Sequence, residues 1–347
     1  MATLRSTKRY MGLTHSQASA LFGPAGPGQR CRLVADADGR AAFALDLGAG
    51  RARTVTPPEA AALLLEELLA CATHALEGPP SGAVISVPAH FSEEAREATV
   101  RAGRAVGLEK VKLILEPVAA GLAYGISPKE SQTVMVVDLG GGTLDVSLLE
   151  VGADAIEVLS SAGDPALGGD DWDAALATWL LEELPERAQR SDPASEFEAG
   201  LLRTARRARE RLSNVSLVRI RVPGVSPNDA PLLSQATLDS LSTALYRRVR
   251  EAVDRVSWQA GIDLNRRPLL IGVILVGGAT RMPGIRRLLG NMTGLPILEA
   301  AVDPDQAVAA GAAIEAARLD GRLEGLAVMD EWRAALLRAL TADNKDA

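Results

Sequence analysis

The chain has few cysteines, histidines and aromatic residues, and these shortages exclude several classes of protein. Among its 347 residues there are 2 cysteines and 3 histidines, and 3% of the residues are aromatic. Cys31 and Cys71 are too few for a disulfide framework, and no cysteine or histidine cluster has the spacing of zinc ligands. With 47% apolar residues, the sequence instead favours an ordinary globular protein with a sizeable hydrophobic core.

Long apolar runs and an excess of positive charge are also missing. No run approaches the roughly 18 apolar residues of a membrane span, and the start lacks the order of a signal peptide. We therefore expect a soluble intracellular protein without a membrane span. The net charge of −7 and the pI near 5.2 argue against a nucleic-acid partner. We expect the one arginine-rich segment to be a solvated helix face, formed by Arg203, Arg206, Arg207, Arg209 and Arg211.

The stretch from Thr133 to Val151, TVMVVDLGGGTLDVSLLEV, has the pattern of a phosphate-binding hairpin. An apolar run of buried-strand length precedes the glycines at 140–142, which leave backbone N–H groups open to a phosphate. Alternation after the turn places Asp145 on the face opposite the core, while Asp138 ends the preceding strand. Two carboxylates beside a phosphate nest predict Mg²⁺ bound through its water shell.

The chain contains an internal repeat of a β-α-β-α unit. Residues 83–125 run strand, turn, helix, strand and small-residue helix, and residues 272–315 repeat this order. The hairpin and a third strand near Ala155–Ser160 precede the second copy, which predicts a doubly wound five-stranded sheet. The first copy has no such opening, so we expect the strand at Ala83–Val87 to have an unpaired edge that something else covers.

Upstream of the first copy, the sequence predicts a small antiparallel patch and one long helix. The helix runs from Pro57 to Leu76, because Thr56 and Glu59 have the spacing of a capping box and Pro57 suits the first helical position. The patch is expected from three short strands, at 31–34, 41–45 and 52–55.

The hairpin closely resembles the second phosphate loop of the seventy-kilodalton heat-shock protein family, which has the actin-like ATPase fold. Other segments resemble family motifs in the family's order: STKRYMG, VPAHF, ILEPVAAGLAYG, LGGDDWD, LVGGATRMPGI and DPDQAVAAGAA. The resemblance covers about residues 6–319. It implies an α/β protein of two lobes with doubly wound mixed sheets.

The resemblance also implies roles for individual residues. It puts Lys8 beside the transferred phosphate, with Glu116 and Asp138 ordering the attacking water and the waters of Mg²⁺. The metal would be held through water by Asp138 and Asp145. ATP or ADP would be bound by Gly140, Gly141, Gly142, Thr143, Gly168, Gly169, Arg209, Ser213, Gly277, Gly278, Arg281 and Asp305. A relay between the lobes would involve Pro88, Arg96 and Pro117.

The sequence departs from the family at both ends and in one helix. It begins after the family's first phosphate loop, so we expect an incomplete first lobe and half of the phosphate clamp. In the helix LRTARRARERLSN, Arg206 and Glu210 stand where the family has a glutamate and an arginine. The two exchanged charges could compensate as a swapped pair, or the protein could no longer bind adenine. After Leu319 the family continues into a peptide-binding β-sandwich, whereas this sequence predicts one amphipathic helix with an apolar stripe of Leu326, Met329, Trp332, Leu336 and Leu340.

These features give an expected organisation and three hypotheses of function. We expect a partial first lobe over residues 1–130, a second lobe over 131–320, and a C-terminal helix and tail over 321–347. The leading hypothesis is a chaperone-like ATP/ADP-binding protein with weak or absent hydrolysis, working with a co-chaperone or a larger assembly. The alternative is a pseudo-ATPase scaffold that docks into a larger assembly. A sugar kinase of the same superfold is the third, disfavoured because the resemblance extends beyond the phosphate loop.

Overall fold

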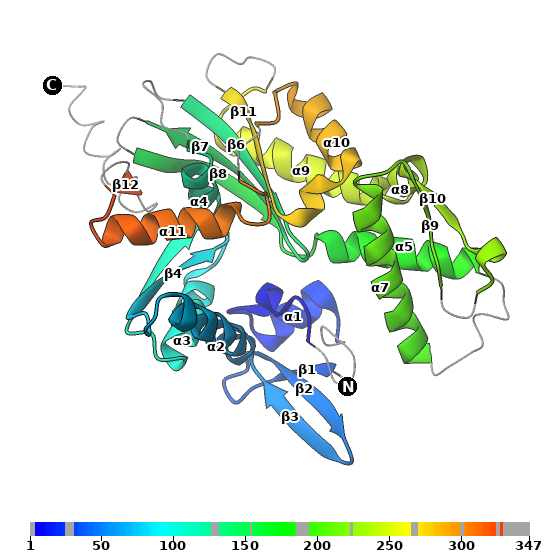
Figure 1. Ribbon diagram of the computed structural model, residues 1–347, viewed down its shortest axis with the longest axis horizontal. Coiled ribbons are helices and arrows are strands. Elements are labelled where there is room, and N and C mark those ends of the chain that lie inside the picture. The colour runs from blue at the N-terminus through cyan, green and yellow to red at the C-terminus, as the bar shows by residue number, and fades with distance from the viewer. Residues whose placement is uncertain are drawn as a thin grey trace.

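The computed structural model of the chain describes residues 4–24, 31–125, 132–152, 155–184, 194–222, 225–264, 270–298, 302–323 and 327–328. Figure 1 shows three groups of elements: an upper five-stranded sheet with its helices, a lower group that carries the N-terminal elements, and a lateral group around α5 and α7. In the described part of the chain, no helix is long and apolar enough to cross a membrane.

The upper group is built on one mixed sheet. Its strands are β6 (Gln132–Leu139), β7 (Leu144–Val151), β8 (Ala155–Asp164), β11 (Leu270–Val276) and β12 (Ala327–Val328). They lie in the order β11-β6-β7-β8-β12, with β6, β7 and β8 antiparallel and the two outer pairs parallel. The predicted hairpin and third strand are therefore confirmed.

Helices cover both faces of this sheet (Figure 1). One face packs on α9 (Thr243–Gln259) and α10 (Pro283–Thr293), and the other on α4 (Glu116–Ala123) and α11 (Ala307–Leu319). Because β6 is apolar at successive positions, it buries side chains on both faces: Met135 and Val137 face α9 and α10, whereas Val134 and Val136 face α4. The glycine turn after β6 is thus anchored in a fully buried strand.

The two small-residue helices of the repeat, α4 and α11, cross in direct backbone contact. A Cβ atom at Gly311 would lie 1.8 Å from the carbonyl oxygen of Ala119, so only glycine allows this approach. Helix α11 also lies against β4 (Gly82–Val87), as both views show. Among the described residues, β4 pairs only with β5 (Lys110–Leu115), in parallel. Helix α11 is therefore one of the elements found against the predicted edge strand, together with α3 and α4.

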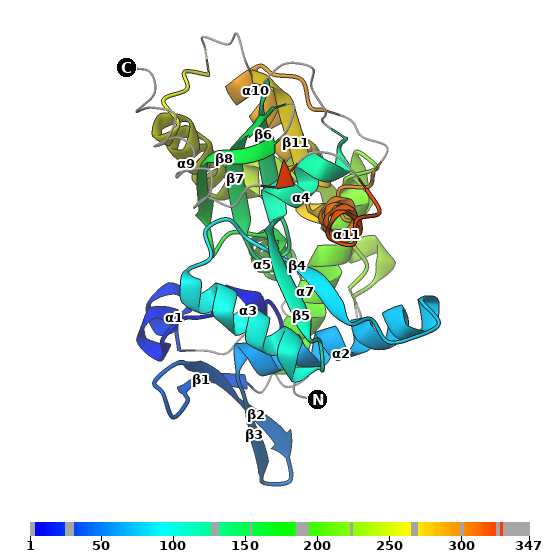
Figure 2. The ribbon, with the colours of Figure 1, turned by 90° about the vertical axis from the view of Figure 1, so that its left-hand side faces the viewer.

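The lower group confirms the predicted patch and long helix (Figure 2). Its strands β1 (Cys31–Ala35), β2 (Ala41–Gly48) and β3 (Arg51–Val55) form an antiparallel sheet. Helix α2 (Pro57–Ala75) starts with the expected Thr56–Glu59 capping box, and α3 (Glu93–Ala105) packs beside it. The one-turn helix η1 (Thr7–Tyr10) and helix α1 (His15–Phe22) precede the sheet. Helix α1 was not predicted from the sequence, although Thr14 and Gln17 form a capping box there.

The lateral group lies beside the upper sheet, and the start of its helix α5 supports the glycine turn. It contains α5 (Gly169–Glu183), α7 (Ala194–Leu212), β9 (Leu217–Arg219), η2 (Pro227–Asp229), β10 (Leu232–Ser234) and α8 (Gln235–Leu241). Trp172 of α5 is fully buried in the same core cluster as Leu144 and Val146 of β7. This shared core fixes the start of α5 beside the glycine turn.

Two predicted elements differ from the structure. The second strand expected in the repeat copy over residues 272–315 is reduced to a single parallel bridge between Ile297 and Val273, because Pro296 has no N–H to donate. The C-terminal helix is wrong at Ala327 and Val328, which pair with β8 as strand β12. The residues of its predicted stripe, Leu326, Met329, Trp332, Leu336 and Leu340, lie outside the described residues.

Candidate functional site

A cavity of about 340 Å³ lies where the turn between β6 and β7 meets η1, the first turn of α4 and the segment after β11. Its lining includes apolar residues such as Val276 and Val308, and the polar residues Ser6 and Arg9. It brings together ten of the predicted site residues: Lys8, Glu116, Asp138, Gly140, Gly141, Gly142, Thr143, Gly277, Gly278 and Asp305.

The glycine turn is held from behind by the start of α5. The N–H groups of Gly169 and Asp170 donate to the carbonyl oxygens of Gly140 and Gly141, at 3.0 and 2.8 Å. A Cβ atom at Gly168 would lie 2.5 Å from the carbonyl oxygen of Gly141, so a side chain there would push the turn away. Gly168 and Gly169 do not line the cavity; they support the turn that does.

The front of the turn presents N–H groups. The N–H of Gly140 donates to the carbonyl oxygen of Thr143 at 3.1 Å, whereas those of Gly141, Gly142 and Thr143 have no hydrogen-bond partner among the described residues. At Gly140 and Gly141 a Cβ atom would meet nothing within 4 Å. Consecutive unpaired N–H groups beside open space form a concave site that suits an anion.

Charged side chains form the opposite wall. The Lys8 ammonium donates to the Glu116 carboxylate in an ion pair, in which Glu116 is buried and Lys8 is 47% exposed. Glu116 is the first residue of α4, and the Lys8 ammonium lies 6.0 Å from the centre of the Phe91 ring. The structure therefore pairs two of the three predicted catalytic side chains, and the third, Asp138, lines the same cavity.

Arg9 and Ser6 link η1 to the lateral group, and the sequence analysis missed both. The Arg9 guanidinium donates to the carbonyl oxygen of Gly142 and to the Asp171 carboxylate, the latter at 3.0 Å. The Ser6 hydroxyl donates to the Asp170 carboxylate at 2.5 Å. The signal for Arg9 was its place beside Lys8 in the basic pair of STKRYMG.

Three carboxylates lie close together at the site: Glu116 and Asp138 line the cavity, whereas Asp145 is buried beside them and does not line it. Asp138 and Asp145 stand opposite each other on β6 and β7. Burial, reinforced by the charges of Glu116 and Asp145, raises the pKa of Asp138 to about 8, while Lys8 opposes the shift. Such crowding of acids favours a cation between them.

Asp145 itself is buried and contacts a residue that carried no predicted role. Nδ1 of His90 lies within hydrogen-bond distance of the Asp145 carboxylate. Burial alone would lower the pKa of His90, but the hydrogen bond and the charge of Asp145 raise it above its ordinary value. The available signal was a lone histidine inside the VPAHF motif.

The carboxylates fit a hydrated magnesium ion better than a directly ligated metal. Within the described ranges, no group of three or more His, Cys, Asp or Glu side chains is arranged to hold a metal ion directly. Mg²⁺ commonly keeps several waters and is bound through one or two carboxylates. Asp138, which lines the cavity and has no side-chain hydrogen bond to another described residue, is suited to accept hydrogen bonds from such waters.

The predicted adenosine side is formed by the turn after β11. Gly277 has φ +81°, and a Cβ atom there would lie 2.5 Å from the carbonyl oxygen of Leu139, so glycine is required. Gly278 packs closely against Asp305. The Arg281 guanidinium pairs with Asp303 and, at 3.4 Å, with Asp305. Arg281 thus does not line the cavity but contacts Asp305, which does.

Arg209 and Arg206 correct the prediction of a solvated arginine face. Arg209 is buried and its Nε lies 2.7 Å from the Asp173 carboxylate. Arg206 pairs with Asp170 at 2.6 Å and with Asp173 at 3.1 Å. The expectation was wrong for Arg209 and only in part for Arg206, whose side chain is 42% exposed, because α7 packs against α5 and the first five residues of α5 supply the acids. It is confirmed for Arg203, Arg207 and Arg211, which are exposed.

Neither Arg209 nor the remaining predicted nucleotide residue on this helix lines the cavity. The N–H of Ser213, just after α7, donates to the carbonyl oxygen of Glu210 at 3.2 Å. Glu210 is exposed, and the direct ion pairs of Arg206 are with the two aspartates of α5. Among the described residues, the direct ion pairs of Arg206 therefore run from α7 to α5 and not to Glu210.

The residues predicted for an interdomain relay lie close to the site. Arg96 donates to the carbonyl oxygens of Phe91 and Ala89, at 3.1 and 3.4 Å. The carbonyl oxygen of Pro88 accepts the N–H of Phe91 at 3.2 Å, and Pro117 is buried in the first turn of α4. Arg96 therefore fixes the loop that carries His90. The relay itself remains a prediction.

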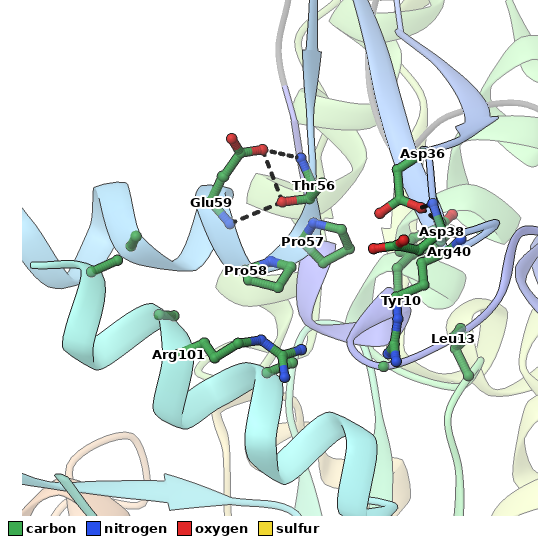
Figure 3. Close-up of a pocket in the computed structure, with 16 residues that line it drawn as sticks. Tyr10, Leu13, Asp36, Asp38, Arg40, Thr56, Pro57, Pro58, Glu59 and Arg101 are labelled. Atoms are coloured by element: carbon green, nitrogen blue, oxygen red, sulfur yellow. Dashed lines mark hydrogen bonds between the residues drawn. The ribbon is translucent and has the colours of Figure 1, made fainter.

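A second cavity, of about 460 Å³, lies between η1, the β1–β2 turn, α2 and α3 (Figure 3). It has acids but no glycine turn. Asp36 accepts the backbone N–H groups of Asp38 and Arg40, at 2.9 and 2.8 Å, and Glu59 caps α2 through Thr56. These carboxylates are used in local structure, so the smaller cavity remains the candidate site.

Comparison with known proteins agrees with the geometry. A family model described as "Hsp70 protein" matches residues 1–335. The chain is 39% identical to a chaperone protein dnaK of Thalassiosira pseudonana, over 79% of this chain and 46% of the relative. It is 39% identical to a chaperone protein HscA homolog of Acidithiobacillus ferrooxidans, over 94% of this chain and 50% of the relative. The chain spans about half the length of the curated relatives it matches.

Proposed function

The chain belongs to the Hsp70 family and has its actin-like ATPase fold, and we propose that it binds ATP or ADP with Mg²⁺ as a chaperone-like protein with slow hydrolysis. The observation that carries this proposal is the row of unpaired N–H groups from Gly141 to Thr143, on a turn that lines the cavity and has open space at Gly140 and Gly141. Phosphate oxygens of the nucleotide would accept these N–H groups.

The metal would lie between the phosphates and the acids. Asp138 and Asp145 would hold Mg²⁺ through its waters, and the ion would neutralise phosphate charge. The raised pKa of Asp138 supports this assignment, because a nearby cation would relieve the crowding of negative charge.

Lys8 and Glu116 are the proposed catalytic side chains. Lys8 would stabilise negative charge on the transferred phosphoryl group, and Glu116 would accept a hydrogen bond from the attacking water. Catalysis of this kind depends on positioning and electrostatic stabilisation. Both residues line the cavity, and their ion pair keeps the ammonium at the site before nucleotide arrives.

Slow hydrolysis follows from the contrast between the two walls. At the proposed phosphate position, the glycine turn at 140–142 supplies backbone N–H groups, while η1, which also lines the cavity, supplies side chains. Of these, Arg9 is already engaged by Gly142 and Asp171. The phosphate would thus be clasped firmly on one side only, and turnover would be weak or absent.

For the nucleoside end, we propose that Gly277, Gly278 and Asp305 contact the base and ribose. Arg281 would act from the rim through Asp305, and Arg209 would act indirectly by holding the start of α5. We keep the expected division into lobes over residues 1–130 and 131–320 as part of this proposal, with the nucleotide between them.

A scaffold function in a larger assembly is the second candidate, and α2 favours it. Leu63, Leu64 and Leu68 of this helix are 53%, 66% and 59% exposed, which is unusual for large apolar side chains grouped on one helix. A co-chaperone or another partner protein would cover them.

Isothermal titration calorimetry of the purified chain with ATP and ADP, with and without Mg²⁺, separates the two candidates. We expect saturable, Mg²⁺-dependent heat for both nucleotides. An absence of heat at millimolar nucleotide would reject the proposed nucleotide function and favour the scaffold.

A further inference from the structure

We infer that His90 is a positioning residue that holds the Asp145 carboxylate in the orientation needed for Mg²⁺-dependent nucleotide binding. The inference rests on the proposed function and adds a residue for which neither the sequence pattern nor the family comparison supplies a role. Its basis is the contact between His90, in the loop after β4, and Asp145, at the start of β7.

The loop that carries His90 is itself held in place. Arg96 of α3 donates to the carbonyl oxygens of Ala89 and Phe91, the neighbours of His90 on either side. The ring of His90 packs at 5.8 Å from the ring of Phe91, nearly perpendicular to it. A side chain on so fixed a backbone can set the direction of its partner.

Asp145 depends on His90 for its orientation. The Asp145 side chain is 3% exposed, and His90 is the one side chain among the described residues that hydrogen-bonds to it. Across the sheet, β8 places Gly163 opposite Asp145, where a Cβ atom would lie 3.1 Å from Oδ1. The neighbouring Lys8 is engaged by Glu116. A buried carboxylate with one partner takes its direction from that partner.

The contact gives the two oxygens of the Asp145 carboxylate different hydrogen-bond partners. His90 donates from Nδ1 to Oδ1, which leaves Oδ2 free to accept a hydrogen bond from water on the metal. Residues that orient a metal-binding group from behind commonly change metal affinity by about 10- to 100-fold when they are removed. His90 lies on the β4 side of the site and Asp145 on the five-stranded sheet, so the contact also joins two groups of elements.

The test compares His90→Phe, which keeps the ring but cannot donate, with His90→Asn, whose amide can donate from nearly the same place. ADP is titrated calorimetrically at a series of Mg²⁺ concentrations. We expect His90→Phe to raise the Mg²⁺ concentration for half-maximal binding about 10-fold and His90→Asn to stay within about threefold of wild type. Nucleotide binding in EDTA should be unchanged in both. His74→Phe, a distant histidine on α2, is the matched control.

Several outcomes would overturn the inference. A folded His90→Phe protein with the wild-type Mg²⁺ dependence would show that His90 does not position Asp145. Equal losses in His90→Phe and His90→Asn would show that the ring, and not its hydrogen bond, matters. If His90→Phe does not fold, His90→Ala takes its place, because water can then reach the carboxylate. Wild-type protein that binds no nucleotide at any Mg²⁺ concentration would reject the proposed function, a result distinct from the others.

Discussion

The glycine turn and the Lys8–Glu116 pair line the same cavity, but the turn follows β6 of a five-stranded sheet, whereas Glu116 follows β5, which pairs with β4 alone among the described residues. Val134 and Val136 of β6 are buried within a five-stranded sheet that has helices on both faces. In β4, Val84 and Ile85 are only half-buried, and among the described residues this strand pairs with β5 alone. One wall therefore offers backbone groups fixed by a core, and the other offers side chains held by single ion pairs.

Because of this difference, we expect different substitutions to affect nucleotide binding and nucleotide hydrolysis. A side chain added at the glycine turn can block the backbone N–H groups. By contrast, the charged side chains on the other side of the cavity can be removed one at a time. We therefore expect substitutions in the glycine turn to affect nucleotide affinity and substitutions around Lys8 to affect hydrolysis.

The largest single effect on turnover is expected from Lys8→Ala. Removing the ammonium should lower the single-turnover rate of ATP hydrolysis by about 100-fold, because preorganised charge at the transferred group is lost. Affinity should fall by less than about 10-fold, since the glycine turn remains. Phosphate release after rapid mixing measures the rate, and Lys112→Ala, on an exposed position of β5, is the control. If Lys8→Ala hydrolyses ATP at the wild-type rate, Lys8 does not stabilise the transferred phosphoryl group.

The unequal packing of the two sheets can be tested with a matched pair of valines. Val136→Ala should lower the free energy of unfolding by roughly 2 kcal/mol and Val84→Ala by roughly 1 kcal/mol, because less apolar surface is buried around β4. Chemical denaturation followed by circular dichroism gives both values. Equal losses would mean that β4 is as well supported as β6, and the comparison would fail.

The smallest effect concerns the proton on Asp138. Because its pKa is raised to about 8, the folded chain holds a proton that the unfolded chain has already released. Stability of the nucleotide-free protein should therefore fall as the pH rises from about 4 to about 8. Asp138→Asn should remove this slope and raise the melting temperature at pH 8 by about 1–2 °C, if about 1 kcal/mol is regained. A melting temperature at pH 8 no higher than that of wild type would argue against a crowded, buried acid.

Much of the fold followed from local patterns. The apolar run before Gly140, the alternation after Thr143 and the capping box at Thr56 each predict an element that the structure contains. Such elements can be predicted because their signals are periodic or depend on neighbours three or four residues away. The bridge at Ile297 and the pairing of β12 with β8 depend on distant strands, so no local pattern could reveal them.

The residues of the site also fall into those that local patterns predict and those that depend on distant partners. Ten predicted residues meet in the cavity, since each belongs to a motif with its own local pattern. Arg9, His90 and Asp173 could not be assigned from sequence, because their partners are between 36 and 162 residues away. The helix face of Arg206 and Arg209 was misjudged for the same reason: its acids come from another helix.

The central claim, that the turn from Gly140 to Thr143 binds nucleotide phosphates, is tested most directly by calorimetry of Mg·ADP with Gly141→Val. A Cβ atom at Gly141 meets nothing within 4 Å, so the variant should fold, while its side chain occupies the space meant for phosphate. Gly78→Val, also into open space, is the matched control. We expect affinity to fall by at least about 100-fold, or about 2.7 kcal/mol, in Gly141→Val and to stay within about twofold in Gly78→Val. Unchanged affinity in a folded Gly141→Val protein would contradict the claim.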